Sequence, residues 1–95
     1  MKEILLLRND EEKELLFIVT MENINKENEY LFVPEAQIIV TNFIKDHFPN
    51  RDEETKQFKM NDTLYQYVKT DLWYNEPRNK CKVFIRYKQI SERRN

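Results

Sequence analysis

The sequence predicts an α+β fold, in which one or two helices pack on one face of an antiparallel sheet of four or five strands. Three observations predict it. Short apolar runs rich in branched side chains recur near both ends of the chain, a middle segment has apolar residues at helical spacing, and polar segments separate these elements. The 95 residues are enough for one domain, 1–95, with a polar tail at about 91–95.

Residues 2–8 and 14–22 are the first two expected strands. Each has a short run of Leu, Ile, Phe or Val, and a polar turn that starts at Asn9 separates them, so a hairpin is the natural connection. At the centre of each strand, the side chains that point to either face are apolar, and such strands are usually covered on both sides. We therefore expect a helix layer on one face, and a second helix or a second copy of the chain on the other.

The middle of the chain predicts one clear helix. Residues 30–33 are expected to form a short strand or a strand-like lead-in, and Pro34 suits the first turn of a helix over 34–48 that Pro49 ends. The apolar residues of this helix recur every three or four positions, which indicates an amphipathic helix. Its apolar face is expected to bury Ile39, Val40, Phe43 and Ile44 against the hairpin residues Leu5, Leu7, Phe17 and Val19.

The segment 62–74 supports two interpretations. The polar cluster that begins at Asn61 suits a helix N-cap, and Leu64, Tyr67, Val68 and Leu72 follow at helical spacing. The same segment is rich in Tyr, Thr, Val and Trp, which favour strands. We predict a helix at about 62–70 followed by a strand at 71–74, preceded by a charged loop at 50–57.

The last expected strand covers residues 80–90, after a turn at 75–79. Its side chains alternate in character, which is typical of a strand with one buried face. The apolar face carries Cys81, Val83, Ile85 and Tyr87, and the opposite face carries Lys80, Lys82, Phe84, Arg86 and Lys88.

The chain contains no glycine, which excludes several kinds of chemistry. A Walker loop, a dinucleotide-binding turn and a nucleophile elbow all require glycine where the backbone turns at positive φ or approaches a phosphate. His47 is the only histidine and Cys81 the only cysteine, so neither a zinc site nor a Cys–His pair is expected. We expect a packed or capping histidine, a buried thiol, no enzyme activity, no cofactor and no metal.

The expected location is the cytoplasm. The apolar run near the N-terminus spans only four residues before Arg8, and no stretch approaches the roughly 20 apolar residues of a membrane span. A single cysteine fits a reducing compartment. The abundance of Lys, Asn and Ile together with the absence of glycine suits a genome rich in A and T, such as that of a low-GC bacterium or of its phages and plasmids.

Charge is segregated along the chain. Residues 10–35 hold eight acidic and two basic side chains, whereas residues 78–95 hold seven basic side chains and one acidic side chain. Two outcomes are open: the two regions neutralise each other across the sheet, or one of them meets a charged partner.

The leading functional interpretation is a small protein-binding module without enzyme activity. We expect an inhibitor of a host defence system or host enzyme, encoded by a phage or mobile element and acting by steric or electrostatic blockade. Large aromatic side chains flanked by charge are typical of binding surfaces. The expected contact residues are Trp73, Tyr74, Glu11, Glu12 and Glu14.

The alternative is a small nucleic-acid-binding regulator. Basic side chains around an aromatic ring on one strand can follow a phosphate backbone and stack a base. The residues that would do this are Lys80, Lys82, Phe84, Arg86 and Lys88. A sequence pI near 5.9 counts against this function, and lysines on an outer face are also common where an edge strand must avoid aggregation.

Overall fold

The computed structural model describes residues 2–22, 32–75 and 80–90, within which one helix covers an antiparallel sheet of six strands. The α+β class and the helix on one face are confirmed, and the sheet has one strand more than the upper expectation. Its strand order is β1-β2-β6-β5-β4-β3. The elements are β1 (Lys2–Asn9), β2 (Glu14–Glu22), α1 (Phe32–His47), β3 (Arg51–Asp52), β4 (Gln57–Met60), β5 (Thr63–Asn75) and β6 (Lys80–Ile90).

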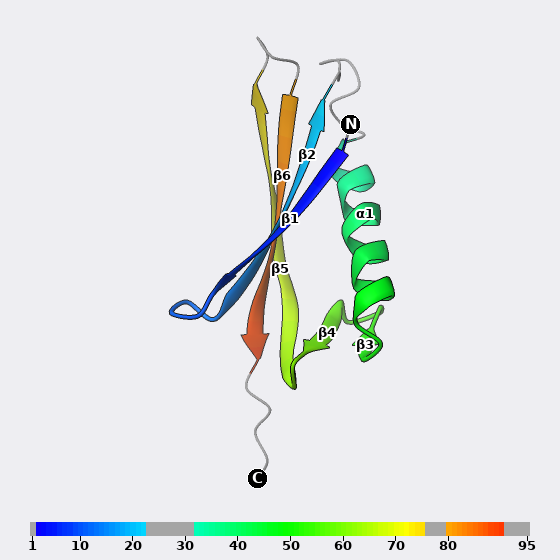
Figure 1. Ribbon diagram of the computed structural model, residues 1–95, viewed down its shortest axis with the longest axis vertical. Coiled ribbons are helices and arrows are strands. Elements are labelled where there is room, and N and C mark those ends of the chain that lie inside the picture. The colour runs from blue at the N-terminus through cyan, green and yellow to red at the C-terminus, as the bar shows by residue number, and fades with distance from the viewer. Residues whose placement is uncertain (1, 23–31, 76–79, 91–95) are drawn as a thin grey trace.

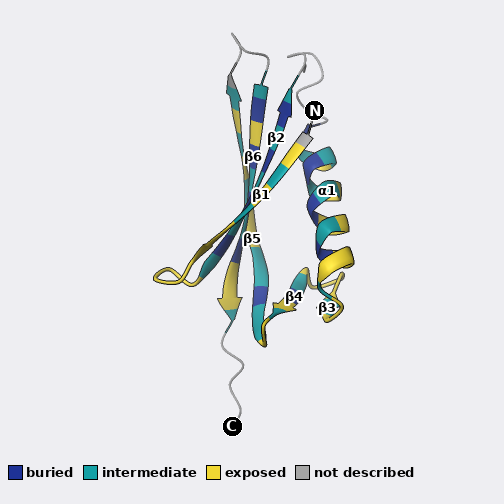
Figure 2. Ribbon diagram, in the orientation of Figure 1, coloured by how far each residue is buried: buried dark blue, intermediate teal, exposed yellow. Residues whose placement is uncertain are grey.

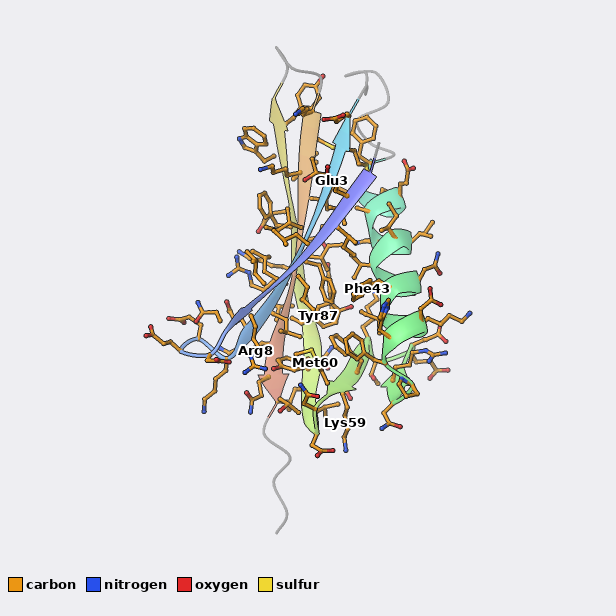
Figure 3. The ribbon with its side chains drawn as sticks, viewed as in Figure 1. Glu3, Arg8, Phe43, Lys59, Met60 and Tyr87 are labelled. Atoms are coloured by element: carbon orange, nitrogen blue, oxygen red, sulfur yellow. The ribbon has the colours of Figure 1, made fainter. Side chains whose placement is uncertain are left out.

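The fold has two layers, with α1 lying along one face of the twisted sheet (Figure 1). Buried residues line the side of α1 and the sides of β2 and β6 that face each other (Figure 2). Phe43 of α1 and Tyr87 of β6 both lie in this layer (Figure 3). Among the described residues, no helix has the combination of length and apolar character that crossing a membrane requires.

The first hairpin forms as expected, but its register places the leucines of β1 differently. Leu6 pairs with Phe17, so the even-numbered residues of β1 share a face with the odd-numbered residues of β2. Ile4 and Leu6 therefore lie under α1. The expectation that Leu5 and Leu7 pack against the helix is wrong. Four residues connect the paired Asn9 and Glu14, and this length places the odd-numbered residues of β1 on the face opposite the odd-numbered residues of β2.

The helix α1 begins earlier than expected, at Phe32. The fully or nearly buried residues of α1 are Phe32, Ala36, Val40 and Ile44, which recur every four positions. Phe32 thus extends the buried stripe by one turn, and the expectation of an extended lead-in is wrong for residues 32 and 33. Residues 30 and 31 lie outside the described part of the chain.

The end of α1 carries the only histidine. His47 is exposed, its ring stacks on Phe43 with centroids 4.1 Å apart, and its Nδ1 lies 2.9 Å from the Phe43 carbonyl oxygen. Phe43 is only partly buried and meets Phe17 edge-to-face at 5.9 Å. The histidine therefore acts as a local cap of the helix end, as expected, but does not belong to its buried stripe.

The segment expected to be a charged loop contains short strands. Arg51 and Asp52 form β3, which pairs with Phe58 and Gln57 of β4. Residues 53–56 connect the two strands and remain exposed. The loop is therefore confirmed only for its centre, because backbone pairing with β4 orders both of its ends.

The expectation of a helix at 62–70 is wrong, since β5 is one continuous strand. Asn61 and Asp62 do not cap a helix. They form the two-residue turn of the β4–β5 hairpin, with φ angles of 51° and 66°, the arrangement of a type I′ turn. Strand β5 pairs with β4 on one side and with β6 on the other, and these two sets of backbone hydrogen bonds outweigh the weak helical pattern.

A β-bulge interrupts the regular alternation of faces along β5. The pairing with β6 shifts between Tyr67 and Lys69, so Val68 is an extra residue without its own partner. Before the bulge, odd-numbered residues such as Tyr65 and Tyr67 face α1, and after it even-numbered residues such as Leu72 do. Of the four residues at helical spacing, only Tyr67 and Leu72 therefore share the α1 face, while Leu64 lies on the opposite face, so the helical pattern in the sequence does not correspond to one face of β5.

The alternation predicted for β6 is confirmed. Cys81, Val83, Ile85 and Tyr87 are all buried under α1. However, β6 lies between β2 and β5, so the interpretation of its lysines as guards of an edge strand is wrong. The edge strands are β1 and β3. Most of the turn expected at 75–79 and the tail at 91–95 lie outside the described residues.

Candidate interaction surface

The face of the sheet opposite α1 carries the residues that sequence analysis selected for function. We call it the uncovered face, because no helix lies over it in the described part of the chain (Figure 1). The strand registers arrange its side chains in rows that run from β1 through β2 and β6 to β5. The rows are Glu3–Thr20–Lys82–Trp73, Leu5–Ile18–Phe84–Asp71, Leu7–Leu16–Arg86–Lys69 and Asn9–Glu14–Lys88–Gln66.

The two middle rows form a continuous apolar strip. Leu5 and Leu7 on the edge strand are 53% and 45% exposed. Three further side chains on β2 and β6 are half-buried. The apolar strip, a name kept below, consists of Leu5, Leu7, Leu16, Ile18 and Phe84.

Ion pairs between β2 and β6 border this strip. An oxygen of Glu14 lies 3.2 Å from Nη1 of Arg86, and an oxygen of Glu22 lies 3.1 Å from Nζ of Lys80. The acidic and basic regions of the sequence therefore neutralise each other in part across the sheet. Across the described uncovered face, five basic side chains stand beside four acidic ones: Lys69, Lys80, Lys82, Arg86 and Lys88 against Glu3, Glu14, Glu22 and Asp71.

Trp73 extends the surface at the β5 side. It is 47% exposed, and Nζ of Lys82 lies 5.9 Å from the centre of its ring, within the range of a cation–π contact. Phe84 stands two residues further along β6 than Lys82, diagonal to Trp73. Two aromatic side chains and one ammonium thus share a small area of the uncovered face.

The structure separates Trp73 from Tyr74. Successive residues of a strand point to opposite faces, so Tyr74 lies on the α1 side, where it packs against the core. Sequence analysis placed both residues in one binding site, and that grouping does not match the fold. Of the two, only Trp73 belongs to the uncovered face.

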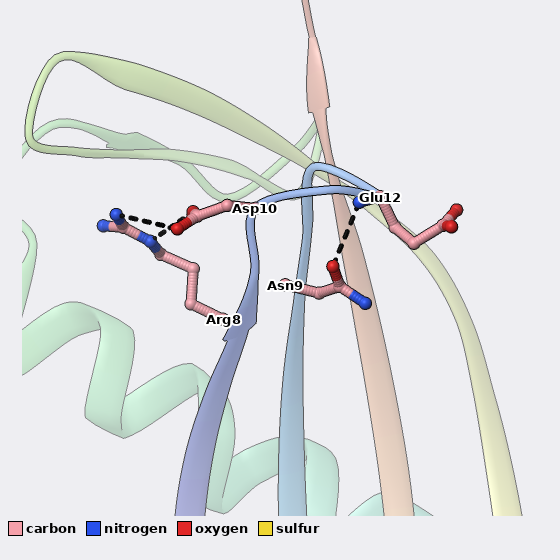
Figure 4. Close-up of polar contacts among 4 residues, drawn as sticks. All are labelled: Arg8, Asn9, Asp10 and Glu12. Atoms are coloured by element: carbon pink, nitrogen blue, oxygen red, sulfur yellow. Dashed lines mark hydrogen bonds and ion pairs between the residues drawn. The ribbon is translucent and has the colours of Figure 1, made fainter.

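Of the acidic candidates, Glu11 and Glu12 lie in the β1–β2 turn at the far end of the sheet, and Glu14 is the first residue of β2. In this turn the backbone N–H of Glu12 donates to the Asn9 side chain at 3.0 Å, and Nε of Arg8 donates to Asp10 at 2.7 Å (Figure 4). A hollow of about 580 Å³ joins the turn to the apolar strip. Its walls are Leu7, Arg8, Asn9, Asp10, Glu11, Glu14, Leu16 and Arg86.

The hollow brings Glu11 and Glu14 together with the apolar strip, whereas Glu12 does not line it. Sequence analysis missed the four aliphatic residues of the strip. One signal was available in the sequence, because both the odd-numbered and the even-numbered residues of the hairpin strands are apolar. The length of the connecting turn could have shown which leucines face away from the helix.

The remaining sequence candidates do not form a chemical site in the described residues. Cys81 is fully buried beneath α1, and His47 lies at the exposed end of that helix. Within the described ranges, no three His, Cys, Asp or Glu side chains are grouped so that they could hold a metal ion. Comparison with protein-family models, with curated proteins and with solved structures found no match to this chain.

Proposed function

We propose that the protein is a protein-binding module that receives its partner on the uncovered face of the sheet. The observation that carries the proposal is the apolar strip, whose residues on the edge strand are about half exposed. A contiguous apolar patch bordered by charged groups is the usual anatomy of a protein interface. Binding there would remove the strip from water without any rearrangement of the core.

The chemistry of this face favours a protein over a nucleic acid. Aliphatic side chains such as Leu5 and Leu7 offer no planar surface on which a base could stack. Two of the basic side chains, Lys80 and Arg86, already face carboxylates, which weakens any attraction for phosphates. The nucleic-acid alternative would depend on Lys82, Phe84 and Trp73, with Lys88 further along β6, beyond Arg86.

The hollow at the end of the strip indicates the chemistry of the partner. Two leucines line it together with Asp10, Glu11 and Glu14. Asp10 is already paired with Arg8, and Glu14 with Arg86, so Glu11 is the acidic side chain that a basic group of the partner would meet. An apolar side chain with one neighbouring lysine or arginine would fit the two leucines and Glu11. Action as an inhibitor, by covering the partner's surface, and an origin in a phage or mobile element remain predictions from size and composition.

The test compares two variants of matched chemistry on opposite faces. Leu5→Thr with Leu7→Thr makes the apolar strip polar but keeps residues that suit a strand. Ile38→Gln removes a 60% exposed apolar residue from α1, on the other side of the molecule. Proteins captured by the wild-type chain from a nuclease-treated bacterial lysate are identified, purified and titrated against both variants.

We expect the Leu5/Leu7 variant to bind the purified partner at least about tenfold more weakly, and Ile38→Gln to bind it as the wild type does. Light scattering of the chain alone is measured in parallel. A dimer that dissociates only in the Leu5/Leu7 variant would identify a second copy as the protein partner. Oligonucleotide binding near physiological salt that is lost on Lys82→Glu, but kept in the Leu5/Leu7 variant, would contradict the proposal.

A further inference from the structure

A second concave site lies on the other side of the sheet, between α1 and the β3–β4–β5 end of the fold. It has a volume of about 540 Å³, within the range of small-molecule sites. The helix packs over β2 and β6, so the half of the sheet formed by β5, β4 and β3 extends beyond it. The cleft is the space between α1 and this half of the sheet. It is separated from the apolar strip by the thickness of the sheet.

The floor of the cleft is apolar and aromatic. Phe58, Ile85 and Tyr87 line it, and all three are almost completely buried. The rings of Phe58 and Tyr87 meet edge-to-face with centroids 5.1 Å apart, so the floor is held rigidly by the core. A floor of this kind favours the apolar or aromatic body of a ligand.

One wall of the cleft carries two cationic side chains, Arg51 and Lys56. Among the described residues, Nε of Arg51 is buried without a hydrogen-bond partner, while Nη1 of the same guanidinium donates to the Phe48 carbonyl oxygen at 3.4 Å. The nearest carboxylate, that of Glu53, lies 4.0 Å away, which is beyond hydrogen-bond distance. A buried donor without an acceptor is costly, but this nitrogen has almost no exposed surface, so a ligand in the cleft would meet the other N–H groups of the guanidinium.

Lys56 stands beside the same space. Its Nζ lies 4.9 Å from the centre of the Tyr67 ring, which lines the cleft as well. Its backbone takes a positive φ of 58°, in the left-handed region that ordinary residues rarely adopt. The turn thus positions a second positive charge at the mouth of the cleft.

The two acidic residues on this wall, Asp52 and Glu53, equal the two cations in formal charge, but they are placed differently. One oxygen of Asp52 accepts hydrogen bonds from the backbone N–H groups of Glu54 and Thr55, at 3.0 and 3.3 Å, so it holds the turn. The side chain of Glu53 is 64% exposed to water, whereas that of Arg51 is only 25% exposed. The more buried charge on the wall is therefore the guanidinium.

We propose that this cleft binds a small, unesterified amphipathic carboxylate. The apolar body would lie on Phe58, Ile85 and Tyr87, and the carboxylate would accept hydrogen bonds from Arg51, with Lys56 close by. A guanidinium is well matched to a carboxylate because its N–H donors form a planar fork.

The test uses decanoate below its micelle concentration and decanol as a neutral ligand of the same chain length. Binding is followed by backbone amide shifts in NMR and by calorimetry, on the wild type, Arg51→Gln, Lys56→Gln and, as a control, Arg8→Gln on the exposed hairpin end. Thermal melts of all variants show that they are folded. Lys56 is exposed, so its variant keeps the test informative if Arg51→Gln unfolds the chain.

We expect decanoate to shift the amides of Tyr67 and Ile85 and to bind at least about tenfold more tightly than decanol. Arg51→Gln should remove this preference, Lys56→Gln should reduce it, and Arg8→Gln should leave it unchanged. Equal binding of the two ligands would overturn the proposal. So would binding that the Leu5/Leu7 variant abolishes, because the ligand would then lie on the apolar strip.

Discussion

The guanidinium of Arg86 and the carboxylate of Glu14 lie 3.2 Å apart on neighbouring strands, although 72 positions separate the two residues in the chain. Both side chains are largely shielded, at 34% and 22% exposed. The pair links the acidic and basic ends of the sequence and borders the apolar strip. Nε of the same arginine is buried without a hydrogen-bond partner, so Glu14 is its principal anionic contact in the described residues.

Glu14→Ala should therefore destabilise the fold by about 1 kcal/mol, since a half-buried charge loses its partner. Urea unfolding measures the change. Glu11→Ala, on an exposed residue of the same turn, is the control and should change the free energy of unfolding by less than about 0.5 kcal/mol. The difference between the two variants should shrink at high salt. Equal effects would mean that the ion pair contributes nothing.

Tyr87 should make the fold sensitive to alkali. Burial, with a smaller contribution from Tyr67, raises the pKa of Tyr87 to about 12 from its usual value of 10.0. The folded state therefore holds this proton more tightly than the unfolded state does. The resulting stability is complete below pH 10 and is lost as the pH rises through about 12.

The measurement is the urea midpoint as a function of pH, compared between the wild type and Tyr87→Phe. We expect the wild type to lose more stability than the variant between pH 10 and 12. Phenolate absorbance should show one tyrosine that ionises late while the chain is folded. Parallel pH profiles for the two proteins would contradict the burial argument.

Lys13 occupies a backbone conformation in which glycine is usual. Its φ is 56°, and its carbonyl oxygen accepts a hydrogen bond from the N–H of Gln89 at 2.9 Å. A side chain at positive φ is strained by its Cβ atom. Lys13→Gly should raise the free energy of unfolding by up to about 1 kcal/mol, whereas Lys13→Ala, which keeps the Cβ, should give no gain. A stabilising alanine would show that the gain has another source.

The bulge at Val68 makes a prediction about deletions. If Val68 is deleted, Tyr67 can still pair with Tyr87 and Lys69 with Arg86, so both halves of β5 keep their faces. The cost should be below about 1 kcal/mol. Deletion of Asp71 instead turns Lys69 toward the core. Circular dichroism melts should show a cooperative fold for the first deletion and none for the second.

Trp73 and Tyr74 should respond differently to truncation. Trp73→Ala should leave the melting temperature nearly unchanged and weaken partner binding by about 2 kcal/mol, because its side chain is half exposed on the uncovered face. Tyr74→Ala should destabilise the fold by about 2 kcal/mol, since it packs against the core. A Trp73 variant without a cooperative melt would remove this residue from the interface.

Local patterns were sufficient to predict several elements. The first hairpin, the helix centre and β6 each show one clear period over many residues, so the buried residues Phe17, Val40 and Val83 could be assigned in advance. The candidate site was predicted only in fragments. Phe84 and Trp73 were each selected, but for different functions, and nothing in the sequence showed that they share one face with Leu5 and Leu7.

By itself, the sequence determined which segments alternate between apolar and polar side chains, which segment has apolar residues at helical spacing, and which motifs are impossible without glycine. Only the tertiary structure decided which face of the sheet each side chain occupies. The register of the hairpin turns Leu5 and Leu7 away from α1, and the bulge at Val68 puts Trp73 on the uncovered face. Both depend on which backbone groups pair between strands distant in the chain, and a shift of one residue in that pairing moves every following side chain to the opposite face.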